Sequence, residues 1–285
     1  MTLSSVTNGL ADSCATISAT RPQRFVAAEQ GAPLCPLVSA VLAAFLRGSA
    51  RHMELIKPYT FDLDSQHTVL VVLDMQNATC IRHAGYGKAL ADAGEPDAQR
   101  AFFERVEKIV IPRQQQLLDY FRHNGLRVVF TASGCLAEDC MDAPPHRAVR
   151  YRFRRQYAGS PEYEIIEAVR PLPGEVVINK GTVSAFVSTG LDSMMRSWGA
   201  RAALFTGVLT DVCVGGTARH AADLGYDSLI VEDCCGTTDA ALHATELRTF
   251  GRLFGRVEPT VSVIEELERS RARRARPQAP KITRS

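Results

Sequence analysis

The stretch HTVLVVLD, residues 67–74, decides the fold class of this chain. Its aliphatic and β-branched side chains do not alternate with polar ones, which predicts a β-strand buried on both faces. Strands of that kind belong to parallel sheets that helices cover on both sides. The stretch ends in Asp74, so a carboxylate lies at the carboxyl end of the predicted strand.

Further strands and helices alternate after this one. Helical spacing over residues 98–124, with Pro112 marking a helix start or a kink, comes before strands at 126–131 and 175–179. Three pairs of a helix and a strand then follow, and a final helix ends the pattern. The pairs are 189–198 and 201–207, 212–224 and 227–232, and 240–254 and 258–263. The order predicts a three-layer α-β-α fold with a parallel, doubly wound sheet of about six strands.

The two ends differ in composition from the body of the chain. Residues 1–52 are rich in Ser, Thr, Ala and Arg, with Asp12 and Glu29 as the acids. They resemble a transit peptide in composition but lack the order of a signal peptide, and Met53 is an alternative start. We expect a poorly structured extension at 1–52 that is dispensable for chemistry, one globular domain at 53–268 and a basic disordered tail at 269–285.

Charge and cysteine usage exclude several classes of protein. Residues 269–285 carry seven basic residues and no acids, which leaves 26 basic against 31 acidic residues, a charge of about −5, in the rest of the chain. Such a body argues against a nucleic-acid partner. No apolar run approaches the ~20 residues of a membrane helix. The eight cysteines include no C-x-x-C pair, so we expect reduced thiols in a cytoplasmic protein.

Three chemically active side chains fall where predicted strands end. Asp74 follows the first strand, Lys180 the third, and Cys213 starts the helix after the fourth. Functional groups of doubly wound sheets collect at these ends. A thiol attacks a carbonyl as thiolate, so it needs a group that accepts its proton. Asp74 can accept the thiol proton and later donate it, and Lys180 can orient Asp74. The N-terminus of a helix offers backbone N–H groups that stabilise an oxyanion. Each residue taken alone has a structural explanation, as a turn cap, a surface lysine or a core cysteine.

Three segments resemble the signature blocks of the isochorismatase-like cysteine hydrolases. They are residues 73–77 (LDMQN), 179–186 (NKGTVSAF) and 206–214 (TGVLTDVCV), in the order the family has them. The resemblance covers roughly residues 60–267. The family includes nicotinamidases, N-carbamoylsarcosine amidases, ureidoacrylate hydrolases and biuret hydrolases. Residues 229–239 (LIVEDCCGTTD) look most like the biuret and carbamoyl-amide branch.

The resemblance implies the isochorismatase-like hydrolase fold and assigns a role to each matching residue. Asp74, Lys180 and Cys213 would form the catalytic triad. The peptide between Val208 and Leu209 lies where the family has a non-proline cis bond, and the backbone N–H groups of Leu209 and Cys213 would form the oxyanion hole. Members are commonly dimers or tetramers, so we expect a homodimer or homotetramer.

The chain also departs from parts of the family pattern. Nicotinamidases carry an Asp-x-His metal site after the second strand, but residues 131–135 read TASGC, so we expect neither a metal nor another cofactor. The usual Asn-Asp-Phe reads Asn77-Ala78-Thr79 here. Candidate substrate-binding residues by position are Asn77, Arg82, Phe186 and Thr210. The basic run at 147–155 (RAVRYRFRR) can guard an anionic substrate, although a solvated loop is the favoured interpretation.

The leading prediction is therefore an amidohydrolase that uses Cys213 to cleave a small linear amide of the carbamoyl or ureido type. Alternatives are vinyl-ether hydrolysis of the isochorismatase type, a catalytically silent scaffold of the same fold, and a thiol redox sensor using Cys213 or the pair Cys234 and Cys235. The sequence does not name the substrate.

Overall fold

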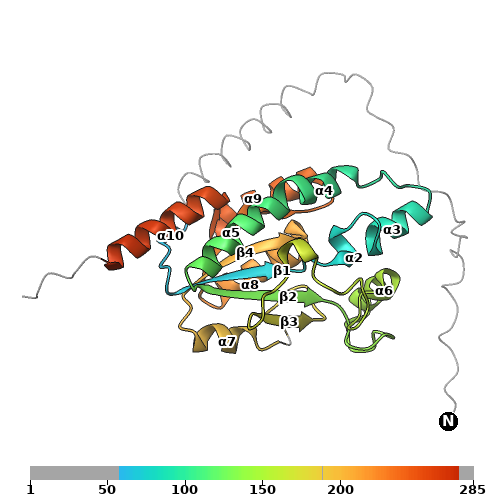
Figure 1. The fold of residues 1–285 in the computed structure, drawn as a ribbon, viewed down its shortest axis with the longest axis horizontal. Helices are drawn as coiled ribbons and strands as arrows, with labels where there is room; N and C mark the ends of the chain where they lie inside the picture. The colour runs from blue at the N-terminus through green and yellow to red at the C-terminus, as the bar shows by residue number, and fades with distance from the viewer. Residues whose placement is uncertain (1–57, 188, 276–285) are drawn as a thin grey trace, which may run out of the picture. The chain divides into compact units, whose positions relative to one another are not determined.

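Six parallel strands form one sheet in the order β3-β2-β1-β4-β5-β6 (Figure 1). The computed structural model describes residues 58–187 and 189–275. The strands are β1 (Thr68–Leu73), β2 (Arg127–Ser133), β3 (Val176–Lys180), β4 (Ala202–Val208), β5 (Asp227–Gly236) and β6 (Arg256–Glu258). The parallel sheet of about six strands that the sequence predicts is confirmed.

Helices connect these strands. They are α2 (Asn77–Cys80), α3 (Gly85–Asp92), α4 (Arg100–Arg105), α5 (Ile111–His123), α6 (Pro145–Arg154), α7 (Leu191–Ser197), α8 (Gly215–Asp223), α9 (Ala240–Leu253) and α10 (Thr260–Ala275). Two π-helical turns, η1 (Val106–Val110) and η3 (Thr210–Val214), and a 3₁₀ turn, η2 (Glu167–Val169), complete the set. Pro112 lies in the first turn of α5, where its missing N–H is tolerated.

Two apolar cores, one on each face of the sheet, make the three layers. Helices α4, α5 and α10 supply side chains such as Phe103, Leu117 and Leu267 to one core. Helices α7, α8 and α9 supply Met195, Ala218 and Phe250 to the other. Successive β1 residues belong to alternate cores, which is why the strand carries an unbroken apolar run.

The strand order sets the position of the site. The chain passes from β1 outward through β2 to β3, and then returns beside β1 as β4 and runs outward to β6. The order therefore reverses between β1 and β4, and the carboxyl ends of these two strands border a crevice. Asp74 follows β1 and the turn that holds Cys213 follows β4.

The structure corrects the last predicted strand. We expected a strand at 258–263, but β6 ends at Glu258 and α10 begins at Thr260. The Asp233 carboxylate accepts hydrogen bonds from the N–H and the Oγ1 of Thr260, at 2.9 and 2.7 Å. This contact fixes the helix start, and Val263 and Leu267, four residues apart, then face the core.

Two basic segments also differ from expectation. The run 147–155 is not a solvated loop, because residues up to Arg154 belong to α6. Helix α10 continues to Ala275, past the expected domain boundary at residue 268. Arg274 reaches back to pair with Asp64, and Ser270 accepts a hydrogen bond from the N–H of Ser65, so this part of the predicted tail packs on the domain. The predicted extension 1–52 and residues 276–285 lie outside the described residues.

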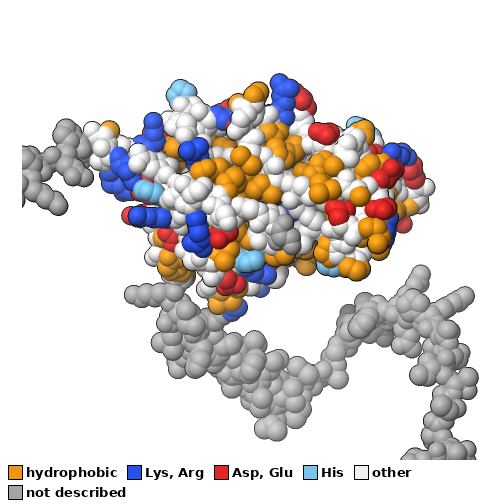
Figure 2. Space-filling model, turned by 90° about the horizontal axis from the view of Figure 1, so that it is seen from below, with side chains coloured by type: hydrophobic (Ala, Val, Ile, Leu, Met, Phe, Trp, Pro, Cys, Tyr) orange, Lys and Arg blue, Asp and Glu red, His pale blue; other side chains and the backbone are white. Residues whose placement is uncertain are grey.

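The surface and the cysteines bear on the alternative interpretations. Figure 2 shows apolar side chains across the middle of one face and Lys and Arg gathered toward one end, so that face carries no continuous basic stripe. Among the described residues, no helix is long and apolar enough to cross a membrane. Cys234 and Cys235 are buried in opposite cores of the sheet, a position that does not favour the redox-sensor interpretation.

Candidate active site

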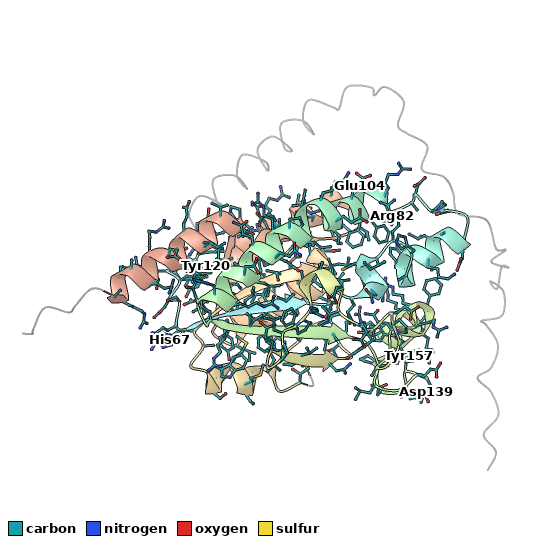
Figure 3. The ribbon with its side chains drawn as sticks, in the orientation of Figure 1. His67, Arg82, Glu104, Tyr120, Asp139 and Tyr157 are labelled. Carbon is teal, nitrogen blue, oxygen red and sulfur yellow. The ribbon has the colours of Figure 1, made fainter. Side chains whose placement is uncertain are left out.

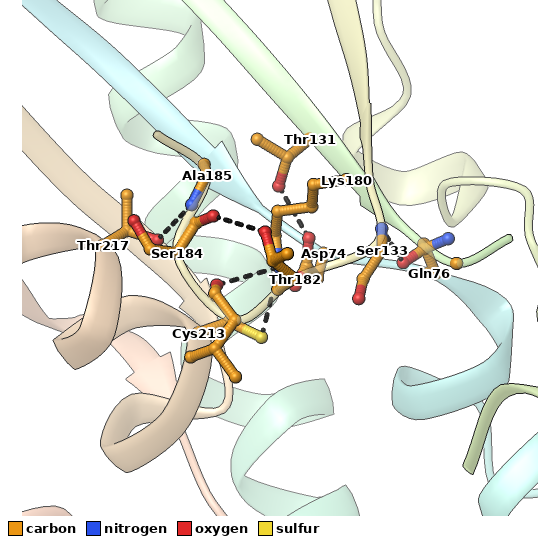
Figure 4. A network of polar contacts seen from close by, with 12 residues as sticks. Asp74, Gln76, Thr131, Ser133, Lys180, Thr182, Ser184, Ala185, Cys213 and Thr217 are labelled. Carbon is orange, nitrogen blue, oxygen red and sulfur yellow. Dashed lines mark hydrogen bonds and ion pairs between the residues drawn. The ribbon is translucent and has the colours of Figure 1, made fainter. Parts of the chain in front are cut away.

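A buried ion pair lies at the carboxyl ends of the central strands. Lys180 at the end of β3 reaches Asp74, with Nζ 2.8 Å from Oδ2. Thr131 of β2, which separates the two strands, donates its Oγ1 proton to Asp74 Oδ1 at 2.6 Å (Figure 4). The relative exposures of Asp74 and Lys180 are 3% and 1%. Both carboxylate oxygens therefore have a fixed partner away from bulk water.

Cys213 joins this pair through its sulfur. Lys180 Nζ lies 3.3 Å from Cys213 Sγ and also donates to the carbonyl oxygens of Thr182 and Val183 at 3.1 and 3.2 Å. Burial raises the pKa of the Cys213 thiol, Lys180 opposes that rise, and Asp74 adds to it through its charge and a hydrogen bond. Burial opposes the charge of Lys180, but Asp74 and Cys213 hold the pKa of that amine above its usual value. The resting site thus favours a protonated thiol beside an ammonium–carboxylate pair.

The backbone around Asp74 is specialised. Asp74 has φ of 55°, a left-handed conformation that costs about 1–3 kcal/mol away from glycine and is best tolerated by Asp and Asn. Gly207 of β4 pairs with Leu73, the residue before Asp74, and an added Cβ at Gly207 would lie 1.9 Å from the carbonyl oxygen of Leu73. Only glycine therefore fits beside the turn that directs the Asp74 carboxylate into the site.

The segment between β4 and α8 carries the nucleophile candidate. The peptide between Val208 and Leu209 is cis. Cys213 lies in the π turn η3, which runs directly into α8. Val208, Leu209 and Cys213 line the same cavity, so the backbone of the expected oxyanion hole lies at the wall next to Sγ.

A cavity opens beside the sulfur. It holds about 420 Å³ of empty space, part of which is open to solvent. Its lining residues are Asp74, Thr79, Ser133, Arg147, Arg150, Arg154, Gln156, Val208, Leu209, Val212 and Cys213. The Gln76 Oε1 atom accepts hydrogen bonds from the Ser133 N–H at 2.9 Å and from Gln156 Nε2 at 3.0 Å. This buried amide joins the β2 end to the wall of the cavity.

Arg147 is a second cation near the sulfur of Cys213. Its Nη2 is 3.9 Å from Cys213 Sγ, 3.0 Å from Ser133 Oγ and 2.9 Å from the Tyr151 hydroxyl. The Tyr151 hydroxyl and Ser133 Oγ are themselves 2.6 Å apart. Two neutral hydroxyls therefore hold a guanidinium next to the nucleophile candidate.

The four expected substrate-binding residues do not line this cavity. Asn77 donates to the carbonyl oxygen of Pro161 at 2.8 Å and lines a separate cavity. Arg82 lies beside α4 in Figure 3, with its guanidinium carbon 5.6 Å from the ring centre of Phe103. Phe186 is packed in the core of α7 and α8. The structure does not bring these three together with Cys213.

Thr210, the fourth, is fully buried and belongs to a polar chain behind the π turn. Its Oγ1 lies 2.8 Å from Nδ1 of His243, and Nε2 of His243 lies 3.0 Å from Arg105 Nη2. Arg105 also donates to the carbonyl oxygens of Cys235 and Glu232 at 2.9 and 3.2 Å. Since a guanidinium only donates, His243 must accept at Nε2 and donate from Nδ1 to Thr210. Thr210 thus anchors the turn from behind.

Sequence reasoning missed the contribution of α6. Arg147, Arg150 and Arg154 fall at positions i, i+3 and i+7, which share one face of a helix. That spacing is present in the basic run at 147–155, for which we expected a solvated loop. No group of three or more His, Cys, Asp or Glu side chains suited to a metal ion occurs within residues 58–187 and 189–275.

Comparison with known proteins identifies similar sequences. A family model described as "Isochorismatase domain" matches residues 68–261. A ureidoacrylate amidohydrolase, RutB, from Methylorubrum extorquens is 31% identical over 233 residues, which cover 76% of this chain and 89% of that relative. The RutB of Variovorax paradoxus is 29% identical over 226 residues, covering 75% of this chain and 85% of the relative.

Solved structures share the fold at lower identity. A cysteine hydrolase from Pseudomonas syringae superposes with a TM-score of 0.64 at 22% identity, covering 75% of this chain and 98% of the other. N-carbamoylsarcosine amidase from Thermoplasma acidophilum gives a TM-score of 0.52 at 24% identity, covering 68% of this chain and 96% of the other. The three-layer architecture is therefore the one these proteins have.

Proposed function

The chain belongs to the isochorismatase domain family, and from that premise we propose that it is a cysteine amidohydrolase that cleaves a small linear amide. The substrate class we propose is a carbamoyl or ureido compound. Relatives named ureidoacrylate amidohydrolase support the amide class.

One observation carries the proposal. The Cys213 sulfur lies 3.3 Å from Lys180 Nζ, and that nitrogen lies 2.8 Å from the Asp74 carboxylate, in the wall of a cavity open to solvent. A nucleophile, a proton acceptor and an orienting cation thus meet where a small carbonyl compound can enter. A silent scaffold needs none of the three buried together, and vinyl-ether hydrolysis needs no thiol beside Asp74.

The first half of the reaction forms a thioester. Asp74 takes the thiol proton as Cys213 Sγ attacks the amide carbonyl carbon. The carbonyl oxygen becomes an oxyanion, which the backbone N–H groups of Leu209 and Cys213 stabilise. When the intermediate collapses, the C–N bond breaks and the nitrogen takes the proton from Asp74 to leave as ammonia or an amine. Lys180, with its Nζ 2.8 Å from Asp74 Oδ2, keeps the carboxyl group of Asp74 directed at the sulfur.

The second half restores the thiol. Water enters the place of the departed amine and attacks the thioester carbon while Asp74 accepts one of its protons. The C–S bond breaks, the acid leaves, and the sulfur recovers the proton held by Asp74. The cycle consumes one water per amide and needs no further reactant.

Ammonia release from a panel of amides tests this proposal. The panel contains ureidoacrylate, biuret, N-carbamoyl amino acids, maleamate and nicotinamide. We expect release from at least one member, and its loss in Cys213→Ala and Cys213→Ser. A matched control is Cys235→Ala, since Cys235 is a fully buried core thiol whose pKa burial raises. Full turnover by Cys213→Ala would exclude the mechanism.

The expected homodimer or homotetramer stays a prediction. Light scattering of the purified full-length chain measures it directly. We propose no nucleic-acid or membrane partner, since the substrate proposed here is a small molecule.

A further inference from the structure

Helix α6 places three arginines beside the cavity of Cys213, although it packs inward through Ala148 and Tyr151. Arg147 and Arg154 are partly buried there, and Arg150 lines the cavity from an exposed position. The outward face of α6 carries Val149 and Phe153, whose relative exposures are 63% and 64%. A surface helix normally directs its charges away from the protein. The inward packing of Ala148 and Tyr151 does not account for three arginines beside one cavity.

These three arginines form no ion pair within the part of the chain that the structure describes. None of the ion pairs among the described residues includes Arg147, Arg150 or Arg154, and the carboxylate in the cavity wall, Asp74, is already paired with Lys180. The guanidinium carbon of Arg154 instead lies 5.0 Å from the ring centre of Tyr86. Burial, together with Arg147 and Arg150, lowers the pKa of Arg154. Like charges gathered in a partly enclosed space repel one another, and a bound anion would relieve this repulsion.

The position of these arginines relates them to the scissile bond. Arg147 Nη2 lies 3.9 Å from Cys213 Sγ, and Arg150 and Arg154 extend the same wall along one side of α6. A substrate whose carbonyl carbon lies on Sγ would place its next few atoms against this wall. The cavity is small and partly open to solvent, which favours a short substrate.

We propose that the arginine face of α6, formed by Arg147, Arg150 and Arg154, is a subsite for a carboxylate carried by the amide substrate. The inference rests on the proposed amidohydrolase activity and narrows its substrate class to short acids with a primary amide or terminal ureido group. A carboxylate is planar and matches a guanidinium through two parallel hydrogen bonds. Neutral amides such as biuret then lack the group that this wall binds.

Matched substrate pairs test the subsite. N-carbamoyl-β-alanine is compared with N-propylurea, and maleamate with cis-but-2-enamide, so that each pair differs by a methyl in place of the carboxylate. We expect kcat/KM for ammonia release to favour the acid by about 100-fold or more in whichever pair turns over. Arg150→Gln and Arg154→Gln should each lower kcat/KM for the acid by about tenfold and leave the slow neutral analogue unchanged.

The control variant is Arg152→Gln. Arg152 is an exposed arginine of the same helix whose Nη1 donates to the carbonyl oxygen of Asp139 and which does not line the cavity. It should keep the wild-type preference for the acid. Equal kcat/KM for acid and neutral analogue, or an equal loss in Arg152→Gln and Arg150→Gln, would overturn the inference. Because Arg150 is exposed, its variant is expected to fold even if Arg154→Gln does not.

A binding measurement separates this inference from the proposed function. Alkylation of Cys213 by iodoacetamide is followed with N-carbamoyl-β-alanine or N-propylurea present. We expect the acid alone to slow alkylation in the wild type and Arg152→Gln, and to lose this effect in Arg150→Gln. Protection without any ammonia release would support the subsite while rejecting the activity. Ammonia release without selective protection by the acid would reject the subsite alone.

Discussion

At the residue scale, we expect the buried pair of Lys180 and Asp74 to have a large effect on the free energy of unfolding. Both side chains are almost fully buried and 2.8 Å apart. Lys180→Met would leave the Asp74 carboxylate buried without its cation, which costs about 3–5 kcal/mol of the free energy of unfolding. Urea denaturation measures this loss, and we expect turnover to disappear as well.

Two further variants decide whether that loss comes from burial. Lys88→Met removes an exposed partner of Asp92, with both side chains more than half exposed, and should change the free energy of unfolding by less than about 1 kcal/mol. The double variant Asp74→Asn, Lys180→Met removes both charges and should recover part of the stability. A double variant as unstable as the sum of the single ones would contradict this account.

The thiol itself gives a second prediction at this scale. Burial raises the pKa of Cys213, whereas Lys180 and Arg147 lower it. Alkylation by iodoacetamide follows the thiolate, so the midpoint of its rise with pH should lie above the value of about 8.5 that a free cysteine shows. Arg147→Met removes one of the two cations and should shift the inflection to higher pH. A shift to lower pH in that variant would show that Arg147 does not act on the sulfur.

At the element scale, α9 holds the turn that carries Cys213. His243 of α9 bridges Thr210 and Arg105. Burial and the Arg105 charge lower the pKa of His243 to about 4. His243→Phe should lower the free energy of unfolding by about 1–3 kcal/mol, because two buried polar partners lose their hydrogen bonds. It should also lower kcat more than it raises KM, because it loosens the nucleophile rather than the arginine wall.

The sign of the pH dependence follows from that lowered pKa. The folded protein holds His243 neutral while the unfolded chain protonates it below about pH 6.5. The stabilisation is therefore complete above that pH and is lost as the pH falls toward about 4. Denaturation curves between these values should show the loss in the wild type and not in His243→Phe. His123→Phe, at an exposed position near the end of α5, is the control and should keep the wild-type dependence.

Elements were predictable where one pattern dominated. Residues 68–73 are buried at every position, as an unbroken apolar run predicts for a central strand of a parallel sheet. The segment 258–263 was ambiguous, since its alternation suits a strand, and the deciding contact comes from Asp233 on β5. Helix α6 was hidden for a similar reason, because three of its arginines line a cavity while Val149 and Phe153 are exposed. The start of α10 and the presence of α6 both depend on contacts between residues far apart in the sequence. The spacing of residues within one segment does not reveal such contacts.

At the scale of the whole molecule, the positions of three residues of the candidate site were predictable from the sequence, because the topology of the sheet determines where strand ends lie. Residues 74, 180 and 213 are far apart in the chain, yet parallel strands bring their carboxyl ends to one edge. The substrate-binding candidates depended on side-chain direction after short loops, as for Asn77 and Arg82. Positions at strand ends were therefore predictable, whereas the wall of the cavity needed coordinates.

The two ends of the described domain are joined by Glu266, which gives the last prediction. Glu266 of α10 accepts from the N–H of Leu63 at 2.6 Å and pairs with Arg256 at 2.8 Å, with side-chain exposures of 12% and 17% for Glu266 and Arg256. Burial opposes its charge, but Arg256 and the Leu63 N–H lower the pKa of Glu266. Glu266→Gln should therefore lower the free energy of unfolding by about 2 kcal/mol at neutral pH.

The contribution of Glu266 to stability depends on pH. Because the pKa of Glu266 is depressed in the folded state, this contribution is present above about pH 4.5 and is lost as the pH falls below it. The gap between wild type and variant should accordingly narrow in acid, as measured by urea denaturation at several pH values. Glu265→Gln, whose pair with Arg269 is 63% exposed on both sides, should show almost no gap at any pH. A gap of the same size for both variants would mean that general surface charge, and not this connection between the ends of the domain, sets the acid sensitivity.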